Sequence, residues 1–128
     1  MSHAHTNNVR TVGIPVTDQD RAVEFYVDRL GLEKRLDMPL PELGGRWIEV
    51  APSGSEMTLA VILARPDLPS GVQTGIRLGT DDAAALRDDL QGRGVDVGEL
   101  LKWPGIPPMF TVNDPDGNVL SITEVEPR

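Results

Sequence analysis

The chain has 128 residues and a formal net charge of −8, with twenty acidic side chains against twelve basic ones. This length suits a single domain with a core of its own, and the acidic balance disfavours nucleic acid or an anionic membrane surface as a partner. The absence of cysteine excludes a disulfide framework and a cysteine nucleophile. No apolar run reaches the roughly 18 residues that a membrane span needs, and no signal peptide is evident, so we expect a cytoplasmic protein.

The first eight residues, MSHAHTNN, are polar and show no apolar period, so 1–8 is predicted to be a disordered tail. They contain the only two histidines of the chain, His3 and His5. The remainder, 9–128, is expected to form one domain without any imidazole. A Ser-His-Asp triad is therefore excluded there.

The first half of this domain predicts one strand, one helix and three further strands. Apolar residues alternate over 12–16 and then recur at helical spacing over 18–30, where Thr17 offers an N-cap hydroxyl and Gly31 a C-terminal stop. Three short runs separated by turn-rich segments are predicted strands, at 32–38, 46–51 and 57–64.

The second half repeats this order after a proline- and glycine-containing connector at 64–71. We expect a strand at 75–79, a helix at 81–93 and strands at 95–101, 109–113 and 118–125. Turn residues recur 63 positions apart, which favours a duplication over two unrelated α+β halves with coincidental turns. Two tandem β-α-β-β-β modules are predicted, at about 9–64 and 72–126. Because each helix covers only one face of its sheet, the other faces should enclose a cavity.

Two segments of the chain resemble a known family. TDQDRAVEFYVDRLGL, at 17–32, is similar to the first helix of the vicinal oxygen chelate superfamily, which includes glyoxalase I, extradiol dioxygenases, fosfomycin-resistance enzymes and bleomycin-resistance proteins. NDPDGNVLSITEVE, at 113–126, is similar to its closing hairpin. The resemblance implies an α+β fold in which paired modules form a cup-shaped mixed β-sheet around a small-molecule site, commonly in a homodimer whose subunits complete each cavity.

In metal-using relatives the ligands stand on the first and fourth strands of each module. Here the resemblance places small residues at those positions: Thr11, Thr58, Ser121, and either Gly75 or Thr74. None offers the thiolate, imidazole or carboxylate that zinc, iron or nickel needs, so we expect no metal and no cofactor. Glu49 and Glu124 are candidates for a hard-cation site, although scattered surface carboxylates explain them better.

The side chains that face the cup follow from strand alternation. If Ile48 and Val50 pack under the first helix, Trp47 and Glu49 turn toward the cavity. An indole beside a carboxylate suits a flat, partly cationic or hydroxylated ligand. Arg77 interrupts an apolar strand, so we expect it either to pair with a carboxylate such as Glu49 or to face the ligand, with an exposed position at the dimer seam as the alternative.

A proline-rich stretch that begins at Trp103 is predicted to form the mouth of the cavity, although both tryptophans could instead be core fillers. Tyr26 is expected in the core, and the DPDG carboxylates, Asp114 and Asp116, are expected to form a turn rather than an acid/base pair. The predicted ligand-binding residues are Met38, Trp47, Glu49, Thr58, Arg77, Trp103, Met109, Phe110 and Ser121.

Two functional hypotheses from different classes remain. The first is a metal-independent binding protein of the self-resistance type, which sequesters an antibiotic or a similar aromatic or apolar compound, as the bleomycin-resistance relatives do. The second is a metal-independent lyase or isomerase on the same scaffold, supported only if Glu49, Arg77 and Ser121 share a cavity. A filled cup that serves as an interaction module is a third possibility. We favour sequestration and assign no catalytic residue.

Overall fold

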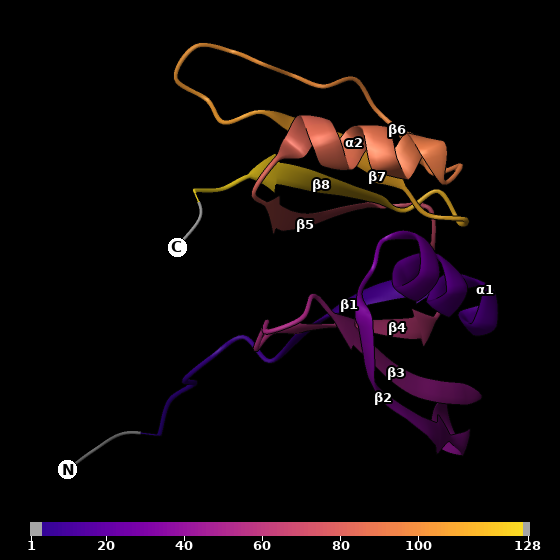
Figure 1. The fold of residues 1–128 in the computed structure, drawn as a ribbon. Coiled ribbons are helices and arrows are strands. Elements are labelled where there is room, and N and C mark those ends of the chain that lie inside the picture. Colours follow the sequence, from indigo (N-terminus) through magenta and orange to yellow (C-terminus); the bar gives the residue numbers. More distant parts are fainter. Residues whose placement is uncertain (1–3, 127–128) are drawn as a thin grey trace.

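The computed structural model describes residues 4–126, which form two successive β-α-β-β-β units (Figure 1). Module one contains β1 (Thr11–Val16), α1 (Gln19–Val23), the π-helix η1 (Glu24–Arg29), β2 (Glu33–Leu40), the 3-10 helix η2 (Pro41–Leu43), β3 (Gly45–Ala51) and β4 (Thr58–Leu63). Module two contains β5 (Gln73–Thr80), α2 (Ala83–Gly92), β6 (Asp96–Val97), β7 (Met109–Asn113) and β8 (Val119–Glu124). The predicted α+β class and the repeated order of elements are confirmed.

Part of the predicted tail, residues 1–3 with His3, lies outside the described residues. Residues 4–10 are exposed and carry neither helix nor strand. Within the described range, no helix is long and apolar enough to cross a membrane.

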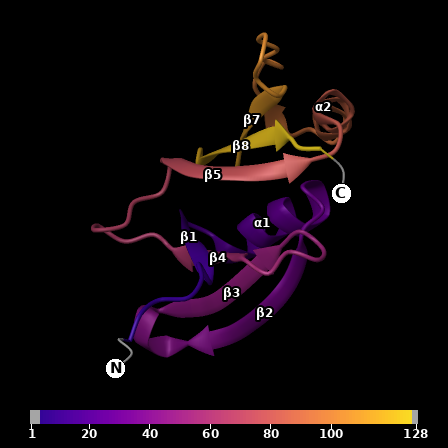
Figure 2. The same cartoon turned by 90° about the vertical axis from the view of Figure 1, so that its left-hand side faces the viewer.

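Each module forms its own four-stranded mixed sheet, with the orders β1-β4-β3-β2 and β5-β8-β7-β6. The outer pairs β1–β4 and β5–β8 are parallel, and the other neighbours are antiparallel. A parallel pair requires a crossover connection, which the helix and the two middle strands of each module supply. In Figures 1 and 2, α1 and η1 lie between the sheet of module one and module two.

Glycines 63 positions apart share the same backbone conformation in the two modules. Gly31 and Gly94, which end the two helical segments, have φ of 83° and 81°. Gly54 and Gly117, in the turns before β4 and β8, also have φ of 83° and 81°. This left-handed region favours glycine, so the predicted 63-residue repeat is confirmed for these turns.

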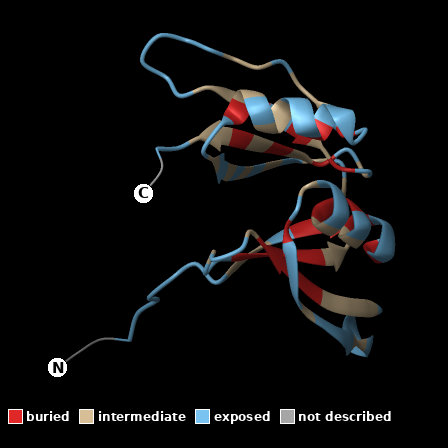
Figure 3. Cartoon of the chain, in the orientation of Figure 1, coloured by how far each residue is buried: buried red, intermediate tan, exposed pale blue. Residues whose placement is uncertain are grey.

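Alternation along the strands gives each sheet a buried face and an open face. Ile48 and Val50 of β3 are fully buried, and Ile76 and Leu78 of β5 pack against the same core, which includes residues from both modules. Figure 3 shows that β2 and β5 are the more exposed strands of their sheets. We use "open face" for the side of each sheet opposite to its helix. On β5 this phase places Gly75, rather than Thr74, on the open face.

The β7–β8 turn joins the two modules through a buried amide. Asn118 is fully buried, and its Nδ2 donates to the backbone oxygen of Pro15 at 2.8 Å and to Asp114 Oδ2 at 2.9 Å. Its Oδ1 accepts from the backbone N–H groups of Gly71 and Val72. All the hydrogen-bonding positions of the amide are used, so one side chain ties together β1, the connector and the turn.

Tyr26, predicted to be a core residue, is fully buried and supplies a second link, because its hydroxyl donates to Asp114 Oδ2 at 2.8 Å. Burial, reinforced by the Asp114 carboxylate, raises the pKa of Tyr26 well above its ordinary value, so the phenol keeps its proton. Asp114 Oδ1 accepts from the backbone N–H groups of Asp116 and Asn118. The prediction of a turn-forming carboxylate is confirmed for Asp114, whereas the Asp116 carboxylate accepts from Thr17 in module one.

The predicted cap of the first helix is wrong by one residue. Asp18 caps α1, and its carboxylate accepts from the backbone N–H of Arg21 at 3.1 Å. Thr17 instead donates its hydroxyl to Asp116 in the other module. Because Asp116 is distant in the sequence, the competition for the Thr17 hydroxyl could not be foreseen from local spacing.

The predicted strand at 95–101 is reduced to the two-residue β6. Pairing with β7 ends after Val97, and Leu101 forms only an isolated bridge with Met109. At Gly98 the chain lies so close to β7 that a side chain would collide with the hydroxyl of Thr111. A glycine at such a close approach commonly marks the end or distortion of a strand.

Candidate ligand-binding site

Trp47 and Glu49 lie on the open face of module one, near the middle of its sheet. β3 is an interior strand between β2 and β4, and its alternation buries Ile48 and Val50 on the helix side, as predicted. Glu49 is only 3% exposed, whereas Trp47 is half-buried. This face therefore holds a buried carboxylate beside a partly accessible indole.

Three donors bind the Glu49 carboxylate and engage both of its oxygens. Its Oε2 accepts from Trp47 Nε1 at 2.7 Å and from Arg10 Nη2 at 3.3 Å. Its Oε1 accepts from the Thr58 hydroxyl at 2.8 Å, and the hydroxyl oxygens of Thr58 and Thr11 are 2.8 Å apart. We call these five residues, Arg10, Thr11, Trp47, Glu49 and Thr58, the Glu49 cluster.

The cluster keeps Glu49 ionised. Burial alone would raise the pKa of Glu49, but the hydrogen bonds from Trp47 and Thr58, together with the charge of Arg10, outweigh it and hold the pKa below its usual range. A carboxylate with a lowered pKa and three donors is a weak base. Its role in this arrangement is to fix the side chains that donate to it.

Arg10 is the member of the cluster that the sequence did not reveal. The sequence suggests Arg77 as one partner for Glu49, but the structure pairs Glu49 with Arg10 and leaves Arg77 exposed on β5. Arg10 precedes Thr11, which is the register partner of Thr58 in the parallel β1–β4 pair, and it is this pairing that brings Arg10 to Glu49.

An apolar surface surrounds Trp47. Met38 of β2 is its register partner and is 48% exposed. A hollow of about 330 Å³ lies next to Trp47 at the end of the sheet, where Ile62 lines it from the open face and Leu63 lines it from the helix side. The open face of module one therefore combines an aromatic ring with aliphatic and thioether groups.

Arg46 lines the same hollow and is held by two carboxylates. It donates to both oxygens of Asp37, at 3.0 and 3.1 Å, and to Asp20 at 2.7 Å. The hydrogen bond from Arg46 lowers the pKa of Asp37. These pairs occupy the guanidinium and fix the rim of the hollow.

The predicted residues of module two lie on or behind a second open face. Met109 and Ser121 line a smaller hollow of about 140 Å³, and Arg77 is the register partner of Ser121. Phe110 borders the same hollow, but its side chain is 1% exposed and belongs to the core, opposite Ile122. Packing explains the position of this ring.

Trp103 lies in the loop between β6 and β7, which Figure 1 shows extending away from the sheet. Its side chain is 55% exposed, and Ile106 of the same loop is 44% exposed. The two tryptophans therefore occupy different environments, because Trp47 is anchored by a hydrogen bond while Trp103 is largely open to solvent.

Within one chain, the predicted site residues fall into two groups, one in each module. Between residues 4 and 126, no hydrogen bond or ion pair joins the Glu49 cluster to Arg77 or Ser121. The trio Glu49, Arg77 and Ser121 is therefore divided between two open faces.

The donors at the metal positions suggested by the sequence do not fit a transition metal. Thr11 and Thr58 engage each other, and Thr58 also binds Glu49, while Gly75 has no side chain and Ser121 is a neutral alcohol. No group of three or more His, Cys, Asp or Glu residues that could hold a metal occurs in the described part of the chain. Glu124, the other hard-cation candidate, accepts from the backbone N–H of Ala83 at the start of α2.

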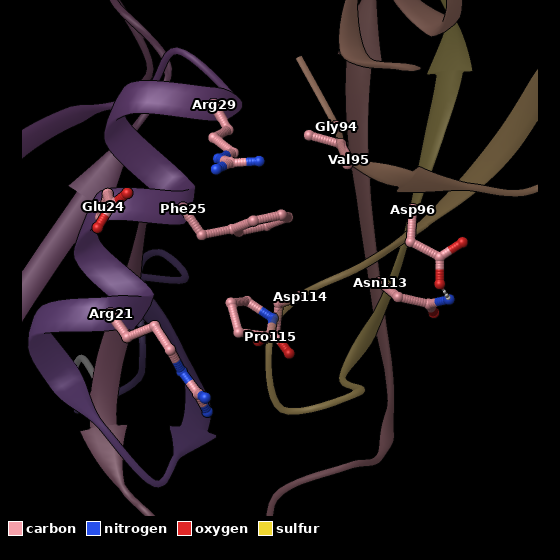
Figure 4. A pocket seen from close by; sticks show the side chains of 10 residues that line it. All are labelled: Arg21, Glu24, Phe25, Arg29, Gly94, Val95, Asp96, Asn113, Asp114 and Pro115. Carbon is pink, nitrogen blue, oxygen red and sulfur yellow. Dashed lines mark hydrogen bonds between the residues drawn. The ribbon is translucent and has the colours of Figure 1, made fainter. Parts of the chain in front are cut away.

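A further hollow of about 350 Å³ lies at the seam between the modules (Figure 4). Figure 4 shows Phe25 and Arg29 reaching from η1 toward module two. Arg29 donates to the backbone oxygen of Arg93, and Arg21 pairs with Asp116 at 3.3 Å. Arg21 and Arg29 of this hollow are engaged in contacts between the modules. We therefore place the candidate site on the open face of module one.

Comparison with known proteins agrees with this architecture. The family model described as "Glyoxalase/Bleomycin resistance protein/Dioxygenase superfamily" matches residues 5–122. The chain belongs to this superfamily, and its two β-α-β-β-β modules agree with the fold of the similar structures.

Three relatives illustrate the similarity. TnmS3, an antibiotic binding protein from Streptomyces sp. CB03234, is 35% identical, with a TM-score of 0.85 over 95% of this chain and 98% of its own. A superfamily member from Sphaerobacter thermophilus DSM 20745 is 33% identical, with a TM-score of 0.84 over 94% of this chain and 98% of its own. The uncharacterized protein YetH of Bacillus subtilis (strain 168) is 31% identical over an alignment of 122 residues, which covers 91% of this chain and 97% of YetH.

Proposed function

We propose that this protein binds and sequesters a flat aromatic or apolar compound, such as an antibiotic, without metal chemistry. The observation that carries the proposal is the anchored indole of Trp47. Its Nε1 is fixed by a buried carboxylate at 2.7 Å, while the ring remains partly accessible beside Met38. A ring held in place before binding presents a large contact area at little entropic cost.

The similarity to TnmS3 supports a binding role, since that protein is an antibiotic binding protein and aligns over nearly the whole of both chains. The donor chemistry of Thr11, Thr58, Gly75 and Ser121 supports independence from transition metals. Shelter of a ligand needs contact area and exclusion of water, and neither requires a metal or a reactive group.

A homodimer would complete the site. Among the described residues, Met38 on the open face of module one and Arg77 on that of module two are exposed, and so are Trp103 and Ile106 in the β6–β7 loop. A second copy that places module two over the Glu49 cluster would bring Arg77, Met109 and Ser121 opposite Trp47. Analytical ultracentrifugation should then give the mass of two chains, and a monomer at all concentrations would contradict this assembly.

The alternative of a metal-independent lyase or isomerase receives less support. It requires a proton acceptor, and Glu49 is buried, accepts three hydrogen bonds and has its pKa held low. A general base works best when its pKa lies near the operating pH.

Sequestration and catalysis are separated by the fate of the ligand. The purified protein is incubated with each member of a panel of aromatic antibiotics, binding is followed by tryptophan fluorescence, and the small molecule is recovered for mass spectrometry. We expect at least one compound to bind and to be recovered unchanged. Conversion that is abolished by Glu49→Gln would overturn the proposal in favour of the enzyme.

A further inference from the structure

The Glu49 cluster contains two charged groups, the Glu49 carboxylate and the Arg10 guanidinium, and they differ in how readily a ligand can reach them. Both oxygens of Glu49 are taken by donors from the chain, and the side chain is only 4% exposed. A cationic ligand group would have to enter a buried position and compete with these donors. The carboxylate is therefore a poor contact for a ligand cation.

Arg10 has the opposite character. Its side chain is 68% exposed, and the one hydrogen bond that this side chain makes among the described residues is the 3.3 Å contact from Nη2 to Glu49. A guanidinium carries five N–H donors in a planar fork. Most of the donors of Arg10 therefore remain available at the edge of the open face.

The backbone holds Arg10 next to the aromatic ring. Its carbonyl oxygen accepts from the Thr58 N–H at 3.2 Å, which ties residue 10 to the start of β4. Arg10 Nη2 and Trp47 Nε1 donate to the same oxygen of Glu49. A ligand that stacks on the indole would thus lie within reach of the free donors of the guanidinium.

We infer that Arg10 selects the class of ligand: the aromatic compound that packs against Trp47 carries an anionic or strongly accepting oxygen, which the free N–H groups of Arg10 bind. Glu49 acts as a positioning residue, which orients both Arg10 and Trp47. This inference rests on the proposed function, since it assigns a chemical class to the ligand of the same site. The net charge of −8 would by itself favour a cationic ligand. A preference for an anionic ligand would therefore have to come from a positive group at the site.

The test compares three probes with the same ring system: 2-naphthoate, neutral 2-methylnaphthalene and cationic 2-naphthylmethylammonium. Affinities are measured by quenching of Trp47 fluorescence in a Trp103→Phe background. We expect the naphthoate to bind about tenfold more tightly than the ammonium, the range expected for one charge-assisted hydrogen bond. Arg10→Gln should abolish this ratio and preserve the affinity for 2-methylnaphthalene, whereas Arg10→Lys should retain part of it.

Arg29→Gln is the matched control, because it removes the same charge at the seam on the helix side and should leave the ratio unchanged. An equal or reversed ratio in the parent protein, or an unaltered ratio in Arg10→Gln, would overturn the inference while binding of 2-methylnaphthalene leaves the proposed function standing. Failure of all three probes to quench Trp47 would overturn both.

Discussion

The two modules share a backbone plan but differ in the chemistry of their open faces. Paired glycines in both adopt the same left-handed conformation 63 residues apart. On the open face of module one, Glu49 is buried and every oxygen of its carboxylate is hydrogen-bonded. The open face of module two carries exposed Arg77 and the small side chain of Ser121, and the hydroxyl of Thr123 is buried without a partner in the described chain. The two modules therefore share the glycine turns that shape their backbones, whereas the polar side chains on their open faces differ.

The seam between the modules should give the largest effect on stability. Asn118→Ala leaves the N–H groups of Gly71 and Val72 and the carbonyl of Pro15 without their partner, so the free energy of unfolding should fall by about 3 kcal/mol. Urea denaturation measures this loss. Asn113→Ala is the control, since Asn113 binds only exposed Asp96, and a similar loss in both variants would contradict a special role for the seam.

The two tryptophans provide the next comparison, this time in affinity. Trp47→Ala should weaken binding of an aromatic ligand about 30-fold, as for a central anchor in an interface, because it removes the fixed ring. Trp103→Ala should weaken binding less than about threefold, because Trp103 is mostly exposed. Isothermal titration calorimetry distinguishes the two, and a larger effect at Trp103 would place the site on the long loop of module two.

A smaller difference is expected between the fourth strands of the modules. Thr58→Val removes a donor to buried Glu49 and should lower the free energy of unfolding by about 1 to 2 kcal/mol. Ser121→Ala should change it by less than about 0.5 kcal/mol, because Ser121 makes no side-chain hydrogen bond within the described residues. Thermal and chemical unfolding of both variants test this, and equal losses would argue against the contrast between the faces.

The smallest effect is a pH dependence that belongs to module one. Because folding lowers the pKa of Glu49, its stabilising contribution is fully present above the usual glutamate range and is lost as the pH falls through the folded pKa. Unfolding free energies measured from neutral to acidic pH should therefore fall more steeply in the parent protein than in Glu49→Gln. Exposed Glu56→Gln is the control and should retain the slope of the parent.

The order of elements was predictable because apolar periods and turn residues are local signals. The sequence also predicted which face of a strand is buried where the residues on that face are apolar, as with Ile48 and Val50 on either side of Glu49. Phe110 shows the limit. Phe110 and Val112 are buried 62 positions after Ile48 and Val50, one fewer than the spacing of the turns, and a shift of one residue exchanges the faces of a strand.

The other members and partners of the site depend on contacts that are distant in the sequence. Arg10 reaches Glu49 across 39 positions, and Thr17 reaches Asp116 across 99. Neither partner could be selected from composition or spacing, because many exposed arginines and aspartates were equally available. The placement of Arg10 therefore required the parallel pairing of β1 with β4.

The indole N–H signals of the two tryptophans in a nitrogen-15 NMR spectrum test the central claim most directly. Trp47 donates to Glu49 and Trp103 is largely exposed, so single Trp→Phe variants assign the two signals. Titration with an aromatic antibiotic that the protein binds should shift the Trp47 signal strongly and the Trp103 signal less. Saturable binding that leaves the Trp47 signal unmoved would contradict the claim that this face is where the ligand is held.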